Sequence, residues 1–179
     1  MSNGLRGPYQ RRLEAIVARV ERDVPGLWAR AVAAGDPAQF WIDNGYPVVT
    51  AAAEATVDVT GGMVAGRLGG DAARAVTYDA IDYVALQAGI RILRAQTVDE
   101  AAPLGPWLAG QHTRDIQWVA GRALAGAGGG RRVVRVPDSR ACDFCREIAS
   151  QSYGQITDVS VHESCRCGWD YLDDDDFPT

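Results

Sequence analysis

The sequence contains no lysine, so all of its basic residues are arginine. The 18 arginines are outnumbered by 23 aspartates and glutamates, which gives a net charge of −5 at pH 7. Proteins that bind DNA or RNA in general depend on a positive face to hold the phosphate backbone, and this balance argues against that class. The net charge does not exclude a local basic patch, because six arginines surround the cysteine-rich region: Arg131, Arg132, Arg135, Arg140, Arg146 and Arg166.

The sequence also lacks an uninterrupted run of about 18 apolar residues, the length that a membrane-spanning helix needs. Its first nine residues are polar and contain glycine, unlike the apolar centre of a secretory signal. We therefore expect that the protein does not associate with a membrane. We also expect it to be made in the cytoplasm, where thiols stay reduced. The four cysteines fall within 26 positions, and in that compartment such a cluster favours metal ligands over disulfides.

Helical signals dominate residues 10–125. Apolar residues recur there at the spacing that places them on one face of a helix. Leu13, Val17, Val20 and Val24 set this pattern in the first helix. We expect further helices over residues 37–44, 47–64, 76–93 and 113–124, and one more that starts at residue 98.

Local start and stop signals divide this helical region. Asp36 before Pro37 predicts the beginning of a helix, since a capping acceptor followed by proline suits the first turn. Thr97 with Glu100 three positions later predicts a capping box. Proline and glycine predict interruptions at Pro25-Gly26, Asn44-Gly45, Gly61-Gly62, Gly69-Gly70, Pro103 and Pro106.

A glycine-rich run at residues 126–130 marks the clearest boundary, and we expect a flexible hinge there. Beyond it, residues 132–136 predict a short strand that Pro137 ends, and residues 169–171 are expected to pair back on it. Aspartate dominates residues 170–176, which predicts a solvated tail. The expected fold is mainly α, with a helical domain over residues 1–126, a small α+β zinc-binding module over residues 127–172 and an acidic tail over residues 173–179.

The cysteines follow a metal-binding pattern: a C-x2-C pair, sixteen further residues, and then H-x2-C-x-C. Zinc takes four ligands in a tetrahedron and prefers thiolate and imidazole, and a tight turn places both sulfurs of a C-x2-C pair on one side of the ion. The five candidate ligands are Cys142, Cys145, His162, Cys165 and Cys167. Three of the four ligands are expected to be Cys142, Cys145 and Cys165. Either His162 or Cys167 is the fourth, with His162 slightly favoured.

The residues around the cluster do not match a catalytic motif. Arg166 stands where a zinc protease of the H-E-x-x-H type needs its second histidine, and a nucleobase deaminase would need the histidine before the cysteine pair. Asp158, Ser160 and His162 lie together in one short loop without the context of a catalytic triad. We therefore expect a structural zinc and no enzymatic activity, with a hydrolase that uses His162 and Glu163, or a zinc-ribbon module that binds nucleic acid, as alternatives. His112 is expected at a helix cap or on the surface.

Two short segments carry a resemblance to a known family. R-V-P-D-S-R-A-C-D-F-C-R-E-I-A-S at residues 135–150 and V-H-E-S-C-R-C at residues 161–167 resemble the C-terminal end of the Mu F-like head morphogenesis proteins. These are minor head proteins of tailed phages, and the likeness is strongest to actinobacteriophage members. It covers roughly residues 135–169 and is only general in the helical part.

The resemblance implies a minor capsid protein that is assembled in the host cytoplasm and lies inside the phage head near the portal. The portal protein and the major capsid protein would be its partners, packaged DNA would be a further one, and the chain would be oligomeric within the particle. Some members are described as capsid maturation proteases. No residues of this sequence match a protease site, so the resemblance implies a structural role.

Overall fold

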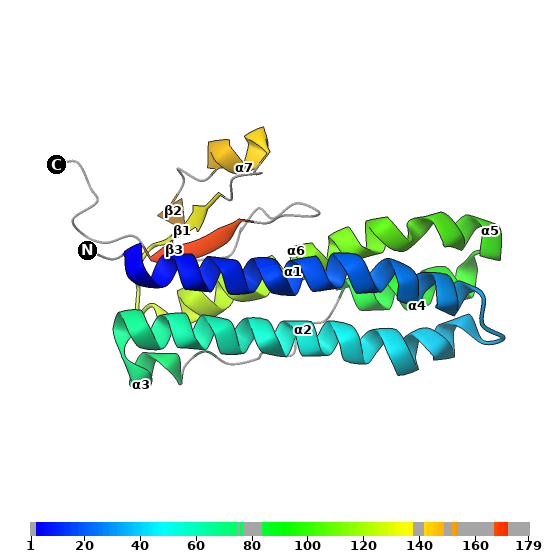
Figure 1. Cartoon of the computed structure of the whole chain (residues 1–179), viewed down its shortest axis with the longest axis horizontal. Helices are drawn as coiled ribbons and strands as arrows, with labels where there is room; N and C mark the ends of the chain where they lie inside the picture. The colour runs from blue at the N-terminus through cyan, green and yellow to red at the C-terminus, as the bar shows by residue number, and fades with distance from the viewer. Residues whose placement is uncertain are drawn as a thin grey trace.

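The computed structural model of the chain describes residues 3–74, 76, 84–137, 142–148, 152–153 and 167–171. This part is mainly helical, as predicted. Three long helices form the body, and shorter elements follow or connect them (Figure 1). The helices are α1 (Asn3–Val32), α2 (Pro37–Leu68), α3 (Gly70–Ala73), α4 (Val84–Ala95), α5 (Val98–Ala101), the 3-10 helix η1 (Ala102–Leu104), α6 (Gly105–Ala127) and α7 (Asp143–Ile148).

The helices α1 and α2 form a long antiparallel hairpin, and α6 packs against both of them (Figure 1). Asp36 ends the turn between α1 and α2, and its carboxylate accepts a hydrogen bond from the Gln39 N–H at 3.0 Å. Pro37 occupies the first helical position, where its missing N–H costs nothing. The predicted helix start at Asp36-Pro37 is therefore confirmed.

The predicted breaks inside the two long helices are wrong. The first helix continues through Pro25-Gly26 to Val32, and the second continues through Asn44-Gly45, Pro47 and Gly61-Gly62 to Leu68. Tertiary packing outweighs the local breakers here, because each helix buries a continuous face against its neighbours. The second helix instead ends at Gly69, whose φ of 95° suits glycine alone.

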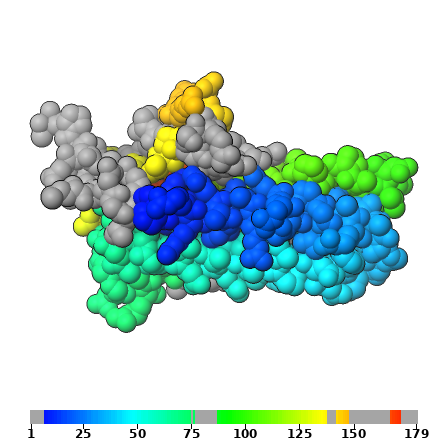
Figure 2. Space-filling view, in the orientation of Figure 1, coloured from blue at the N-terminus to red at the C-terminus, as the bar shows by residue number. Residues whose placement is uncertain are grey.

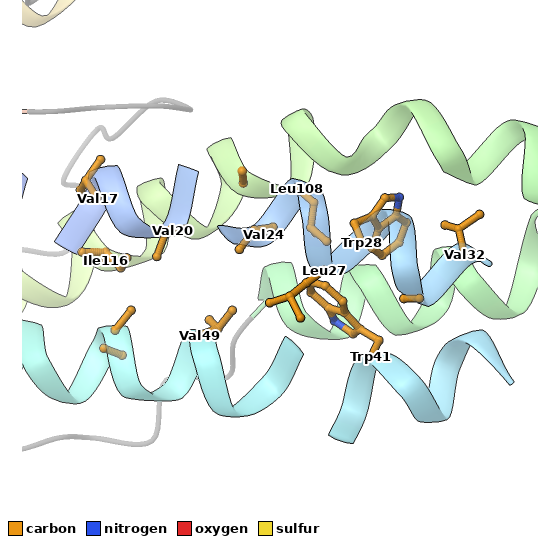
Figure 3. Close-up of a cluster of buried hydrophobic side chains, with 14 of the residues drawn as sticks. Val17, Val20, Val24, Leu27, Trp28, Val32, Trp41, Val49, Leu108 and Ile116 are labelled. Carbon is orange, nitrogen blue, oxygen red and sulfur yellow. The ribbon is translucent and has the colours of Figure 1, made fainter. Parts of the chain in front are cut away.

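A first hydrophobic core fills the space between α1, α2 and α6 (Figure 3). Trp28 of α1 and Trp41 of α2 meet edge to face at its centre, with ring centroids 5.3 Å apart and an interplanar angle of 81°. The Trp28 indole N–H donates to the Ala101 carbonyl at 2.7 Å, which ties α5 to this core. Both indoles are fully buried, and Leu108 of α6 packs in the same cluster.

The segment before α6 follows its sequence signals closely. Thr97 Oγ1 accepts from the Glu100 N–H, and the Glu100 carboxylate accepts from the Thr97 N–H at 2.9 Å, so the predicted capping box is confirmed. The helix that starts at Val98 ends after one turn, as the prolines predict. However, α6 begins at Gly105 rather than at residue 113, because Pro106 falls in its first turn, where proline is favoured.

The C-terminal region contributes a small antiparallel sheet in the order β2-β1-β3. Its strands are β1 (Val133–Val136), β2 (Ser152–Tyr153) and β3 (Gly168–Tyr171), and both predicted strands and their pairing are confirmed. A second hydrophobic core joins this sheet to the helices. It contains Tyr9, Leu13, Met63, Val64, Ala120, Leu124, Ala127, Val133, Trp169 and Tyr171. The sheet is thus packed on the helical body rather than attached through the glycine run alone.

By length and composition, α2 is the one helix in the described ranges that is long and apolar enough to cross a membrane. Its apolar window has a mean hydropathy of 1.2, and 39% of that window is buried. Such helices also occur in the cores of proteins that never enter a membrane, and α2 packs against α1 and α6. The expected absence of membrane association stays a prediction.

Candidate metal centre

The first pair of predicted ligands lies at the beginning of α7. The Cys142 carbonyl accepts from the Arg146 N–H at 3.0 Å, which closes the first helical turn. Cys142 directly precedes α7 and Cys145 lies in its first turn, a spacing that makes the two residues neighbours. Cys142 is exposed, whereas Cys145 is buried. The helix itself lies at the surface (Figure 2). Its Phe144 side chain is 47% exposed.

A third candidate, Cys167, immediately precedes β3 and is buried. The register of the sheet pairs Gly168 with Val136, the last residue of β1. Cys167 therefore lies beside the end of β1 from which the chain runs on to Cys142, six positions after Val136. Strand pairing thus brings the two halves of the cysteine pattern, which are far apart in sequence, to the same end of the sheet.

Arg135 brings a positive charge to one of these thiols. It occupies a buried position of β1, and its Nη1 donates to Cys145 Sγ at 3.9 Å. Its guanidinium carbon also lies 4.9 Å from the centre of the Trp169 ring. A buried guanidinium needs an anionic or aromatic partner to offset its lost hydration. The contact with Cys145 thus suits a sulfur that carries negative charge, as a metal-bound thiolate does.

The third strand anchors this region to the helices. The Trp169 indole N–H donates to the Gln117 carbonyl at 3.0 Å, and the Tyr171 hydroxyl donates to the Leu124 carbonyl at 2.7 Å, both on α6. Between them, Asp170 accepts from Arg67 of α2 at 3.1 Å. Burial raises the pKa of Tyr171 to about 12, so its hydroxyl stays protonated and remains a donor.

Two glycines of the α6 region make room for the aromatic side chains of β3. A Cβ at Gly121 would lie 3.0 Å from the Trp169 ring, and a Cβ at Gly128 would lie 2.8 Å from the Tyr171 ring. The next glycines, Gly129 and Gly130, turn the chain with φ values of 58° and 92°. The glycine run that predicts a hinge therefore also serves close packing.

The outcomes for the five predicted ligands differ. Cys142, Cys145 and Cys167 are thiols rather than disulfides. His162 and Cys165 lie outside the described residues. Within the described ranges no three His, Cys, Asp or Glu side chains are gathered closely enough to hold a metal ion. The three described cysteines are thus not close enough together to bind one metal ion. In the favoured ligand set, two of the four ligands lie outside the described residues.

The residues of the alternative predictions are placed as follows. Asp158, Ser160, His162 and Glu163 lie outside the described residues. Of the six arginines in the predicted basic patch, Arg131, Arg132 and Arg146 are exposed, Arg135 is buried, and Arg140 and Arg166 lie outside the described residues. Arg135 is thus no part of a surface patch.

Two predictions about polar residues are wrong. Asp170 is expected in a solvated tail but is buried, because Arg67 supplies its countercharge. His112 is expected at a cap or on the surface but is fully buried in α6, within a run of buried polar side chains that the sequence reasoning missed. These are Gln111, His112, Thr113, Asp115 and Gln117. The one sequence signal for such a central helix is its density of small residues, which lets neighbours approach on every side.

Comparison of the chain with protein-family models, with curated protein sequences and with solved structures gave no match.

Proposed function

We propose that this chain is a non-enzymatic structural protein of a tailed-phage head, similar to the Mu F-like minor head proteins. One structural zinc ion would hold its C-terminal module. The two motif segments at residues 135–150 and 161–167 support the family likeness. The helical body offers broad outer faces to partner subunits (Figure 2), and the portal and major capsid proteins are the proposed partners.

The observation that carries the zinc proposal is the pairing of Cys145 with a buried arginine beside a second cysteine of the pattern. Arg135 contacts Cys145, and the register of β1 and β3 puts Cys167 at the same end of the sheet. The described elements of the module are short, with four residues in β1 and six in α7. Elements of this size have little core of their own, and bound metal would supply much of their folding free energy.

The proposed ligand set is Cys142, Cys145, His162 and Cys165, with Cys167 as the alternative to the histidine. Zinc in such a set has no open position for a substrate, so it would cross-link the chain without taking part in catalysis. The burial of Arg135 also removes one of the six arginines on which a basic nucleic-acid-binding patch would depend.

Metal content tests the zinc proposal directly. Elemental mass spectrometry on protein purified under reducing conditions should find one zinc per chain, and dialysis against a chelator should remove it. Protein that is folded but contains no zinc under these conditions would refute the proposed metal centre.

The head role needs a separate experiment. The chain should be co-expressed with the portal and major capsid proteins of the genome that encodes it, and the assembled particles should be purified and analysed by quantitative mass spectrometry. The proposal expects a small number of copies per particle and no change in capsid-protein processing in the variant Glu163→Gln, which keeps every proposed zinc ligand. Particles that form without any copy of the chain would contradict the head role, and loss of processing in the variant would favour the hydrolase.

A further inference from the structure

Arg135 stands at an unusual place for a charged side chain. It alternates along β1 with half-buried valines, so it shares the inward face of the strand with Val133 of the second hydrophobic core. Burying a guanidinium in such a position is strongly unfavourable unless its charge is compensated, because the ion loses its hydration. A strand of this kind would ordinarily carry an apolar residue at position 135, so the arginine calls for a specific partner.

Two partners of Arg135 connect elements that are remote in sequence. The first is Cys145 of α7, a proposed zinc ligand, whose sulfur accepts from Nη1 at 3.9 Å. The second is Trp169, the residue that pairs with Arg135 across the β1–β3 ladder, whose ring lies 4.9 Å from the guanidinium carbon. The guanidinium thus bridges a ligand-bearing helix and the strand that is anchored in the helical body.

The charges match on the metal side. Three thiolates and one neutral imidazole around Zn²⁺ leave one net negative charge on the centre. A single buried guanidinium neutralises that charge, and N–H groups that donate to metal-bound sulfur orient the ligand and strengthen metal binding. A neutral thiol at Cys145 would offer Arg135 only a weak acceptor.

Trp169 in turn contacts the long helix α6. Its indole N–H is held by the Gln117 carbonyl, and its ring packs where Gly121 has no side chain. Anything that fixes Arg135 and Trp169 therefore also fixes β3 against α6. The two contacts of Arg135 form a continuous physical connection between the ligand Cys145 and the centre of α6.

From this geometry we propose that Arg135 is a positioning residue of the zinc centre and couples metal binding to the stability of the whole helical body. The inference rests on the proposed zinc site. It adds that the C-terminal module is not an independent zinc knob, so metal binding and the folding of the helices form one cooperative transition.

The test compares full-length protein in metal-free and zinc-loaded forms. Zinc affinity is measured by competition with a chromophoric chelator, and thermal unfolding is followed by far-UV circular dichroism, which reports mainly the helices. In the parent protein, zinc should raise the midpoint of the single helical transition, as expected when a ligand binds only the folded state. Arg135→Met should lower zinc affinity about 10–100-fold, the usual effect of losing a residue that supports a metal ligand. It should also shrink the zinc-dependent rise in the midpoint.

A matched control separates this role from ordinary packing. Tyr171→Phe loses the hydrogen bond to Leu124 in the same strand but touches neither Arg135 nor Cys145 in the described contacts. It should lower the midpoints of the metal-free and loaded forms equally and leave zinc affinity unchanged. Arg135→Lys keeps the positive charge but loses the planar guanidinium, so its zinc affinity should lie between those of the parent and Arg135→Met. This variant replaces Arg135→Met in the test if Arg135→Met does not fold.

The outcomes are distinguishable. A parent protein that binds no zinc refutes the metal centre itself, before any variant is compared. A parent protein that binds zinc, with both Arg135 variants matching its affinity and its rise in midpoint, overturns the role of Arg135. Zinc that leaves the helical transition unchanged, while it orders only a separately melting C-terminal segment, overturns the coupling.

Discussion

His112 stacks on the indole of Trp41 at the centre of the helical bundle, with the ring centroids 6.2 Å apart and the planes inclined by 24°. Neither imidazole nitrogen has a hydrogen-bond partner in the described structure, and the same holds for the Trp41 indole nitrogen. Burial lowers the pKa of His112 from its ordinary value of 6.5 to about 3. The imidazole is therefore neutral in the folded protein and is the main unsatisfied polar side chain of the first core.

This arrangement predicts a loss of stability in mild acid. Between pH 6.5 and about 3 the unfolded chain protonates His112 and the folded chain does not, so the free energy of unfolding falls as the pH falls through this window. Above pH 6.5 both states are neutral and the contribution is fully present. Urea unfolding at pH 7 and pH 5 measures the difference. Since the chain has only two histidines, the variant His162→Asn in metal-free protein removes the other contribution.

Replacing His112 by an apolar side chain of similar volume should stabilise the protein. His112→Met removes two buried, unsatisfied nitrogens and introduces a sulfur that can contact the Trp41 ring, for a gain of about 1–3 kcal/mol at pH 7. It should also flatten the pH dependence between pH 7 and pH 5. A variant that is less stable than the parent at both pH values would show that the imidazole satisfies its nitrogens in solution.

Gly45 should be intolerant of any side chain. A Cβ at this position would lie 2.6 Å from two carbons of the Trp41 ring, so Gly45→Ala forces the indole to shift and should cost about 1–3 kcal/mol. The matched control is Gly62→Ala in the same helix, where a Cβ meets open space. That change should stabilise α2 by about 0.5–1 kcal/mol through the helix propensity of alanine. Equal effects of the two substitutions in chemical unfolding would argue against the packing explanation.

The capping box of α5 gives a local prediction. Thr97→Ala removes the hydroxyl that accepts from the Glu100 N–H and should lower the free energy of unfolding by about 1 kcal/mol. Thr97→Ser keeps an equivalent acceptor and should change stability little. An alanine variant as stable as the serine variant would mean that water satisfies this helix end equally well.

A ligand scan should identify the fourth zinc ligand. Cys142→Ser, Cys145→Ser and Cys165→Ser should each abolish stoichiometric zinc binding, because three remaining ligands hold the ion poorly. We expect the same of His162→Ala, whereas Cys167→Ser should keep one zinc per chain. The reverse result for the last two variants would assign the position to Cys167 instead. Elemental mass spectrometry of each purified variant provides the measurement.

Features set by neighbouring residues could be predicted from the sequence. Asp36 with Pro37 and Thr97 with Glu100 specify helix starts through bonds that span three positions. The alternation at residues 132–136 likewise predicts β1, and the pairing with residues 169–171 follows from the need of that strand for a partner. For the two helix starts, the interaction that decides the structure lies within the pattern that predicts it.

Features set by remote residues could not be predicted in the same way. Asp170 is buried because Arg67, 103 positions earlier, neutralises it. Asn44-Gly45 stays helical because Gly45 has no side chain and leaves room for the Trp41 ring. The helix continues through Pro25 because Val24 and Trp28, on either side of it, are buried. The spacing of the cysteines predicts a metal site, but it gives no sign that a buried arginine would stand beside one of them.

The third strand has a consequence for biosynthesis. Trp169 and Tyr171 complete a cluster that also contains Tyr9 and Leu13, so the second core joins residues that are far apart in the order of synthesis. While the chain emerges from the ribosome, α1, α2 and α6 are available long before the strand that covers their ends, and the apolar surface at those ends is exposed to chaperones in the interval. Nascent chains stalled before residue 168 should therefore retain bound chaperone, and chains in which residues 168–171 have left the ribosome should release it.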